Sequence, residues 1–192
     1  MKKRIAIITA LLSLMSMGKT VLIGTGAVIS SAGFMLAASE KAYAENAEFY
    51  YKRGINKAEE GDFYGAIADY SKAIEINPRY SKAYNNRGNA KRALKDNDGA
   101  IADYSKAIEI NSNSELAYFN RGNTKGSLKD YDGAIADYSK TIEINPNNGS
   151  AYKNRGIAKE LIGDLKGACA DWRRASAMGL KKTDLWILTQ CY

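Results

Sequence analysis

The sequence of 192 residues contains no histidine, two cysteines and two prolines. Without histidine, a catalytic site with an imidazole base and a histidine-ligated metal site are both excluded. Two cysteines are too few for a four-cysteine zinc site or for a small domain held by several disulfides. With 45% hydrophobic and 26% charged residues, the composition is that of a globular protein. We find no catalytic constellation and therefore expect no enzymatic activity, no metal and no cofactor.

The formal net charge of +7 is unevenly distributed along the chain. Residues 1–44 carry five Lys or Arg and one Glu, whereas the remaining residues hold 23 basic and 20 acidic side chains. A nucleic-acid-binding surface needs clustered Lys and Arg, and the larger part of the chain is too nearly neutral for one. We therefore expect proteins or peptides as partners and no nucleic acid.

Residues 1–44 have the pattern of an export signal. Three basic residues (2–4) precede two apolar runs, 5–17 and 21–38. A polar stretch then ends in Ala42-Tyr43-Ala44, the small-x-small pattern that precedes a signal-peptidase cut, here before Glu45. This pattern predicts a cleaved signal and a mature protein in the periplasm or another extracytoplasmic compartment.

An uncleaved membrane anchor is the alternative interpretation of the same segment. The 18 residues of the second run, 21–38, nearly suffice to span a bilayer. In that case residues 5–38 would anchor the protein in a membrane. A bacterial lipoprotein anchor is excluded, because residues 1–44 contain no cysteine.

The rest of the chain repeats itself every 34 residues. Gly54, Gly88, Gly122 and Gly156 mark position 8 of four units, which span 47–80, 81–114, 115–148 and 149–182. Position 4 is always Tyr, position 20 is always Ala and position 24 is always aromatic; these residues are Tyr50, Tyr84, Tyr118, Tyr152, Ala66, Ala100, Ala134, Ala168, Tyr70, Tyr104, Tyr138 and Trp172. A fixed period with such positions predicts a stacked repeat protein.

Each unit has the features of a helical hairpin. Small residues at positions 8 and 20 let two helices approach closely, with the aromatic side chains filling the space between them. Turns such as Gly61-Asp62 would join the two helices, and Asn-Pro at 77–78 and 145–146 would end the second one. A single hairpin cannot bury its apolar face, so the units must stack.

The pattern over 47–182 resembles the tetratricopeptide repeat. The resemblance implies an all-α fold, a right-handed α-solenoid of four hairpins, with residues 183–192 as a C-terminal capping helix. Two positions depart from the family: position 7 is always Arg and position 11 is always Lys; these residues are Arg53, Arg87, Arg121, Arg155, Lys57, Lys91, Lys125 and Lys159. Position 23 is always Asp, on the opposite helix. We expect an Arg–Asp pair across each hairpin.

Thr183 or Asp184 could N-cap a short helix that hides the last apolar face of the stack. This helix would carry Leu185, Trp186, Leu188 and Cys191. Cys169 lies early in the last second helix and Cys191 at the end of the cap. If these helices are antiparallel neighbours, the two cysteines could form a disulfide, which export would favour. Two buried free thiols are the other possibility.

By resemblance, the first helices of the hairpins line a concave groove where a peptide would bind. Its candidate residues are Tyr51, Lys82, Asn85, Asn86, Asn89, Arg92, Phe119, Asn120, Asn123, Lys153 and Asn154. Position 6 repeats Asn86, Asn120 and Asn154, which we call the asparagine ladder. It resembles the asparagine rows that grip peptide backbones in the O-linked N-acetylglucosamine transferase family, since each amide matches one peptide group. A solvated polar residue copied with the repeat is the alternative interpretation.

Some repeat domains that this chain resembles bind the terminal carboxylate of a chaperone tail through a Lys at position 5 and an Asn at position 9. No unit of this chain has that pair, so we do not expect such a tail as ligand. The sequence as a whole predicts an exported, non-enzymatic scaffold that holds an extended peptide segment of a partner protein. The alternative is a membrane-anchored assembly or tethering factor that uses the same repeats.

Overall fold

The computed structural model of the chain describes residues 21–23, 27–29 and 46–191. From residue 46 onward it consists of helices joined by short turns: a helix over residues 46–59, α3 (Phe63–Ile76), α4 (Ser81–Ala93), α5 (Asn97–Ile110), α6 (Glu115–Ser127), α7 (Tyr131–Ile144), α8 (Gly149–Leu161), α9 (Leu165–Ala177) and α10 (Lys182–Gln190). They form four antiparallel hairpins followed by α10, so the predicted all-α solenoid is confirmed.

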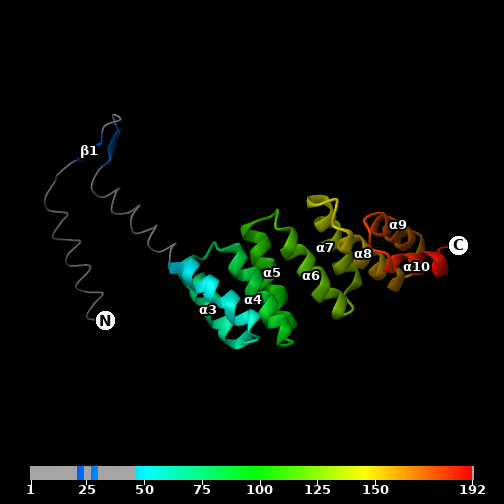
Figure 1. Cartoon of the computed structure of the whole chain (residues 1–192), viewed down its shortest axis with the longest axis horizontal. Coiled ribbons are helices and arrows are strands. Elements are labelled where there is room, and N and C mark those ends of the chain that lie inside the picture. The colour runs from blue at the N-terminus through cyan, green and yellow to red at the C-terminus, as the bar shows by residue number, and fades with distance from the viewer. Residues whose placement is uncertain (1–20, 24–26, 30–45, 192) are drawn as a thin grey trace.

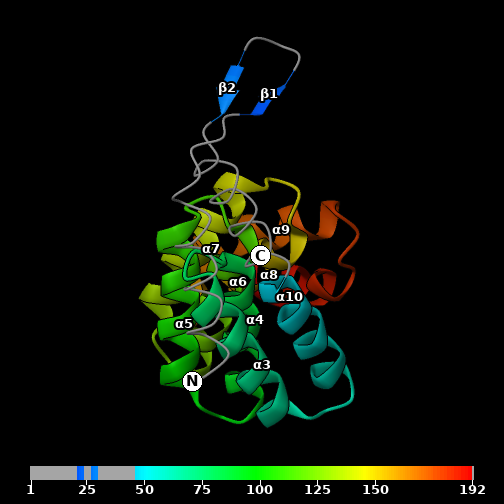
Figure 2. The same ribbon diagram turned by 90° about the vertical axis from the view of Figure 1, so that its left-hand side faces the viewer.

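The hairpins follow one another along the long axis of the molecule (Figure 1), and a view turned by 90° shows each partly behind the one before (Figure 2). Helices α5, α7 and α9 pack against the first helices of their own hairpins, and α3, α5 and α7 pack against the first helix of the next hairpin. The stack therefore has a regular one-dimensional order, in which each hairpin contacts mainly its neighbours.

Two short antiparallel strands, β1 (Val21–Ile23) and β2 (Ala27–Ile29), pair in the N-terminal segment. The sequence pattern of residues 1–44 does not predict them. The predicted cleavage site at 42–44, and all of the proposed anchor 5–38 except these strands, lie outside the described residues. No helix within the described part of the chain is long and apolar enough to cross a membrane.

Each second helix begins with the same capping interaction. Asp62, Asp96, Asp130 and Asp164 accept a hydrogen bond from the backbone N–H three residues later, at 2.9–3.0 Å. The donor is always a glycine, and at Gly133 an added Cβ would come within 2.2 Å of the Asp130 carboxylate. The residue before each aspartate has a positive φ and is Gly61, Lys95, Lys129 or Gly163.

The second helices of the first three units end at an asparagine. Asn77, Asn111 and Asn145 leave the helical conformation, and each side chain accepts a hydrogen bond at 3.1 Å from the backbone N–H two residues on. The second unit ends in the same way although Ser112 replaces proline. Asparagine, which forms such turns readily, is therefore sufficient to end these helices.

The core of each hairpin is a close contact between a glycine and an aromatic ring. A Cβ on Gly88 would lie 2.7 Å from the ring of Tyr104, and one on Gly122 would lie 2.9 Å from the ring of Tyr138. The facing alanines at position 20 are completely buried. The predicted roles of positions 8, 20 and 24 are thus confirmed.

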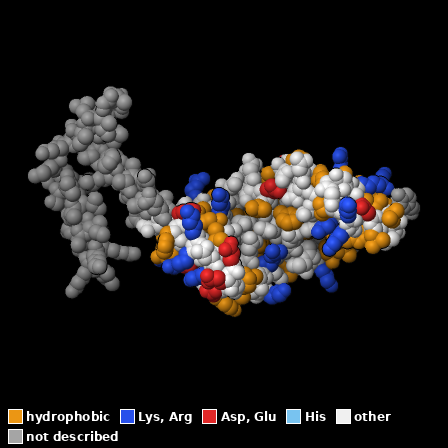
Figure 3. Space-filling model, in the orientation of Figure 1, with side chains coloured by type: hydrophobic (Ala, Val, Ile, Leu, Met, Phe, Trp, Pro, Cys, Tyr) orange, Lys and Arg blue, Asp and Glu red, His pale blue; other side chains and the backbone are white. Residues whose placement is uncertain are grey.

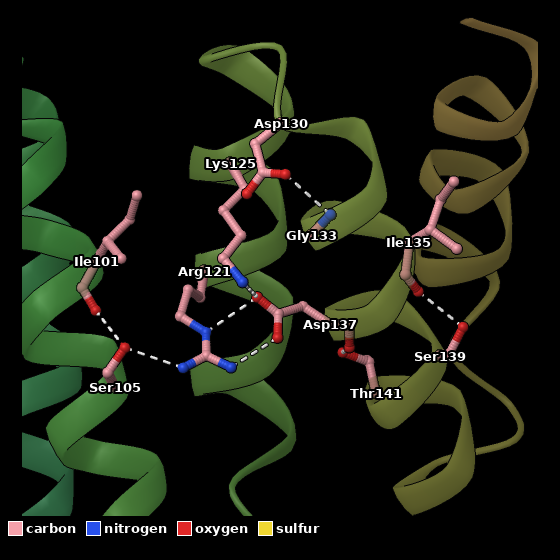
Figure 4. A network of polar contacts seen from close by, with 10 residues as sticks. All are labelled: Ile101, Ser105, Arg121, Lys125, Asp130, Gly133, Ile135, Asp137, Ser139 and Thr141. Atoms are coloured by element: carbon pink, nitrogen blue, oxygen red, sulfur yellow. Dashed lines mark hydrogen bonds and ion pairs between the residues drawn. The ribbon is translucent and has the colours of Figure 1, made fainter. Parts of the chain in front are cut away.

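The Arg–Asp pair predicted across each hairpin is present in all four units, together with the lysine at position 11. In the third unit, Arg121 donates to both oxygens of Asp137 at 2.7 and 2.9 Å, and Lys125 Nζ lies 3.0 Å from the same carboxylate (Figure 4). The four aspartates are only 3–4% exposed. Hydrogen bonds from Arg53 hold the pKa of Asp69 below its usual range.

We call the Arg at position 7, the Lys at position 11 and the Asp at position 23 of one hairpin its clamp. Each of the last three clamp arginines also contacts the preceding hairpin. Arg121 donates to the hydroxyl of Ser105 at 2.9 Å, and that hydroxyl donates to the Ile101 carbonyl at 2.7 Å (Figure 4). Arg87 and Arg155 contact Ser71 and Ser139 in the same way, each at 3.0 Å. In all four units the guanidinium group also lies 5.1–5.7 Å from the centre of the tyrosine ring at position 4, a distance that suits a cation–π contact.

α10 closes the C-terminal end of the stack. The rings of Trp172 and Trp186 lie 5.4 Å apart, and Cys169 and Cys191 form a disulfide with a Cα–Cα distance of 5.6 Å. Closing a loop of this length stabilises a fold by about 3 kcal/mol in the chain-entropy description.

Two details of the predicted cap are wrong. The helix begins at Lys182, after the N-cap residue Lys181, and Thr183 is buried instead of capping the helix. Leu185 and Leu188 are 64% and 66% exposed. The reason is rotational: the face of α10 that carries Trp186, Ile187 and Cys191 packs on α9, so the two leucines lie on the opposite face.

Replacing Gly122 with Ala should lower the free energy of unfolding by about 1 kcal/mol or more, because overpacking typically costs about 1–3 kcal/mol. Gly126→Ala in the same helix is the matched control, since its Cβ would be 3.7 Å from the nearest atom. It should leave the stability unchanged or raise it by up to about 1 kcal/mol, because alanine favours helix. Urea unfolding measures both, and equal stabilities would refute the close-contact argument.

Replacing Asp137 with Asn should lower the free energy of unfolding by at least about 2 kcal/mol, because Arg121 and Lys125 lose their carboxylate partner. Glu143→Gln is the control: it removes a carboxylate 2.7 Å from Lys140, but that side chain is 67% exposed. An exposed pair contributes at most about 1 kcal/mol. Similar losses in the two variants, measured by urea unfolding, would contradict a special role for the buried clamp.

Candidate functional site

The first helices of the four hairpins form the surface on which the candidate groove residues lie. Helices α4 and α6 contact each other, as do α6 and α8. Four hollows follow this surface, with volumes of about 620, 280, 510 and 240 Å³. All four are lined in part by asparagine side chains from these helices, so the surface offers a row of polar recesses.

Most of the predicted groove residues line these hollows. The largest contains Tyr51, Lys82, Asn85 and Asn86, and the 510 Å³ hollow contains Asn89, Arg92 and Asn123. Asn123 also lines the smallest hollow, together with Asn154. The structure brings these residues together along one surface.

The remaining predicted residues, Phe119, Asn120 and Lys153, line none of these four hollows. Phe119 is half-buried, with its ring 5.9 Å from that of Tyr138. Asn120 and Lys153 are also half-buried, on α6 and α8. All three lie on the first helices without entering a recess.

The asparagine ladder connects neighbouring hairpins. Asn86 Nδ2 donates to the hydroxyl of Tyr51 at 3.2 Å, and Asn120 Nδ2 donates to Asn85 Oδ1 at 3.1 Å. Asn154 Nδ2 donates to Asn123 Oδ1 at 2.8 Å. One N–H of each ladder amide is thus committed to the preceding unit, which leaves at most the other N–H and part of the carbonyl capacity for a ligand.

Three further groove asparagines have structural partners that the sequence analysis missed. Asn85 is 7% exposed and bonds to both Asn86 and Asn120, so it forms part of the groove floor. Asn89 and Asn123 accept hydrogen bonds from Tyr104 and Tyr138 at 2.8 and 2.9 Å. The sequence contained a signal for this pairing, because these two units alone combine Asn at position 9 with Tyr at position 24.

The tyrosines behind the groove are held in their neutral form. Burial raises the pKa of Tyr104 and of Tyr138 to about 12, and that of Tyr70 likewise. At neutral pH their hydroxyls therefore stay protonated and can keep donating to the groove asparagines.

One contact at the rim of the largest hollow was also missed. The Tyr80 hydroxyl donates to the Glu48 carboxylate, and its ring lies 4.9 Å from that of Tyr51. This hydrogen bond lowers the pKa of Glu48, while burial and the adjacent carboxylate raise the pKa of Tyr80. Position 34 differs in every unit, so the repeat pattern carried no signal for it.

The groove presents chemistry for holding a polar chain. Its walls provide amide donors and acceptors, aromatic rings, and the cationic side chains of Lys82, Arg92 and Lys153. Within the described residues, no cluster of three or more Cys, Asp or Glu side chains could hold a metal ion.

Comparison with known proteins agrees with this geometry. The family pattern described as "Tetratricopeptide repeat" matches residues 116–148, and a related pattern described as "TPR repeat" matches 57–91 and 88–128. An uncharacterized protein of Methanocaldococcus jannaschii is 43% identical over 42 residues, which are 22% of this chain. The aligned part spans about half (49%) of that relative's length.

Solved structures with the same fold include the crystal structure of MamA, with a TM-score of 0.68 and 28% identity over 77% of this chain and 86% of that one. The TPR domain of Arabidopsis OM64 has a TM-score of 0.60 and 26% identity, over 62% of this chain and 98% of that one. The first TPR domain of Spaghetti (RPAP3), bound to an HSP90 peptide, has a TM-score of 0.62 and 25% identity, over 62% and 95%.

The period, the hairpin geometry and these matches agree. Residues 57–148 are tetratricopeptide repeats, and repeats of this family act as scaffolds for protein–protein interaction.

Proposed function

We propose that the protein is a non-enzymatic scaffold whose first helices hold an extended peptide segment of a partner protein. The observation that carries the proposal is the asparagine ladder beside the row of hollows. Asn86, Asn120 and Asn154 come from successive hairpins and are half-buried, so the recesses could admit a chain that runs along the stack.

The hydrogen-bonding groups that the ladder amides leave unused suit a peptide backbone. A side-chain amide offers both a donor and an acceptor, as one peptide group does, and recognises it without reading its side chain. Apolar contact would come from Tyr51 and from Leu116, which line the largest hollow; Leu116 is 63% exposed. Such a site favours extended segments of moderate polarity.

The bound peptide of the Spaghetti domain supports the general mode, in which a repeat of this fold holds a peptide. This support does not extend to the identity of the peptide that the present chain would bind. The Lys–Asn pair expected for a grip on a terminal carboxylate is absent here, because positions 5 and 9 are Tyr51 and Ile55 in the first unit and Asn85 and Asn89 in the second. The proposed ligand is therefore an internal extended segment.

The proposed location is outside the cytoplasm, with residues 1–44 removed before Glu45. The basic start, the apolar runs and the small-x-small pattern support cleavage. The disulfide between Cys169 and Cys191 also fits an oxidising compartment. The alternative, a tethering factor anchored through residues 5–38, uses the same groove.

Replacing all three ladder asparagines with Ala should weaken peptide binding at least about tenfold, since each lost hydrogen bond contributes about 0.5–1.5 kcal/mol. A photo-crosslinking residue at Phe119 would first identify the bound segment in native cells by mass spectrometry. A synthetic peptide of that segment would then be titrated calorimetrically against wild type and variant.

The controls separate ligand contact from stacking. Tyr51→Phe and Asn85→Ala remove the acceptors of Asn86 and Asn120 while leaving the ladder amides in place. They should disturb the stack as the ladder variant does but keep peptide affinity within about fivefold, because a bridging bond contributes only about 1 kcal/mol. Equal affinity of wild type and the triple variant would refute the ladder as the binding element.

The mass of the protein purified from its native host under non-reducing conditions tests the location. We expect a chain that begins at Glu45 and has the mass of the disulfide form, two hydrogens lighter than the dithiol. A chain that retains residues 5–38 and extracts only with detergent would instead establish the anchored alternative.

A further inference from the structure

The outer face of α10 exposes two leucines on the side away from α9. Leu185 and Leu188 lie there, at 64% and 66% exposure, whereas Trp186 and Ile187 on the other side of α10 are partly buried against α9. The preceding exposed lysines, Lys181 and Lys182, stand within one or two turns of these leucines. The face is therefore apolar in its middle and basic at its start.

The adjacent helix adds further positive charge. Lys166 and Arg173 of α9 are exposed, and Arg173 lies beside the end of α10, where it donates to the Cys191 carbonyl at 3.4 Å. Figure 3 shows apolar side chains gathered at the end formed by α10 and Lys and Arg side chains over α9 beside them. None of these four basic side chains forms an ion pair within the described part of the chain.

Acidic side chains at this end of the stack are fewer than basic ones. The fourth unit contains eight Lys or Arg against three Asp or Glu, far more basic than the other units. Of those three, Asp171 is buried in the clamp with Arg155 and Lys159, Asp164 caps α9, and Glu160 is exposed near the end of α8. Asp184 of α10 accepts a hydrogen bond from Ser176. The positive charge at this end of the molecule is thus largely uncompensated.

We infer that the outer face of α10, with the basic side chains beside it, binds the surface of an anionic phospholipid membrane. Leucines that enter the boundary between headgroups and acyl chains, flanked by lysines on anionic headgroups, are the usual combination for a helix lying on a bilayer. The inference goes beyond the proposed groove and does not depend on it, because the face lies at the end of the stack.

Charge complementarity favours lipid over a second copy of the chain. A symmetric dimer through this face would bring Lys181, Lys182 and Arg173 of one protomer towards the same residues of the other, and like charges repel. An anionic bilayer offers both an apolar layer for the leucines and negative charge for the lysines. One such helix gives weak, reversible binding that depends on ionic strength.

The test uses the chain that begins at Glu45, because the apolar runs of residues 5–38 would bind lipid themselves. The buried apolar residues all lie within 47–175 and pack on one another, so this chain contains its own core. Sedimentation with phosphatidylcholine vesicles, with or without about one-third phosphatidylglycerol, measures binding. We expect binding only to the anionic vesicles, weakening as salt is added.

Two double variants address the two halves of the face. Lys181→Glu with Lys182→Glu should weaken binding at least about 25-fold, because two positive charges at about fivefold each are lost and two negative charges are added. Leu185→Ser with Leu188→Ser should weaken it about tenfold or more. The matched controls, Lys95→Glu with Lys129→Glu and Leu128→Ser with Leu161→Ser, alter exposed side chains elsewhere and should bind like wild type.

A second measurement uses the full-length chain in the same vesicles. Deuterium exchange over residues 181–191 should slow when the lipid is anionic, and the leucine variant should lose that protection. The inference is overturned if the patch variants bind as wild type does. It is equally overturned if light scattering shows a dimer that Leu188→Ser dissolves, because the face would then be covered by a second copy.

Discussion

The buried aspartate at position 23 is the constraint that the rest of the stack satisfies. A carboxylate that is 3–4% exposed is stable in its charged form only with cationic partners in good geometry. In each hairpin these partners are Arg at position 7 and Lys at position 11, one helical turn apart on the opposite helix. This three-residue clamp fixes the register of the two helices. Because the arginine also donates to a serine of the preceding unit, the clamp sets the spacing between hairpins as well.

The groove is built from side chains that also hold the stack together. The ladder amides each bond to the preceding hairpin, and Asn89 and Asn123 satisfy the hydroxyls of buried tyrosines. This sharing holds the amides in place before a ligand arrives, which reduces the entropy lost on binding. It also means that only part of each amide is available. A ligand that lies along these amides would therefore bind with modest affinity and with little dependence on its sequence.

Periodicity was enough to predict what recurs in every unit. The hairpins, the Gly–aromatic contacts and the Arg–Asp pair each depend on residues repeated four times, so one physical argument served all units. Features that occur once were missed: β1 and β2, the Tyr80–Glu48 contact, and the rotation of α10 that leaves Leu185 exposed. The candidate groove residues lie on the first helices, and their role in binding stays a prediction. Their mutual hydrogen bonds were not foreseen, because contacts between units depend on how the hairpins are superposed, which spacing alone does not fix.

The two ends of the stack differ in a way that follows from the same clamp. Within the described residues no hairpin precedes Arg53 to supply a serine, and the Arg53 side chain is 46% exposed, against 17–18% for the other three clamp arginines. At the other end, the position that carries Ser71, Ser105 and Ser139 in the first three units is Arg173. A further hairpin docking there would bring its own clamp arginine against Arg173 instead of a hydroxyl. The fourth unit therefore cannot be extended by the contact that joins the others, and α10, held by the disulfide, covers the apolar surface that an additional repeat would have buried.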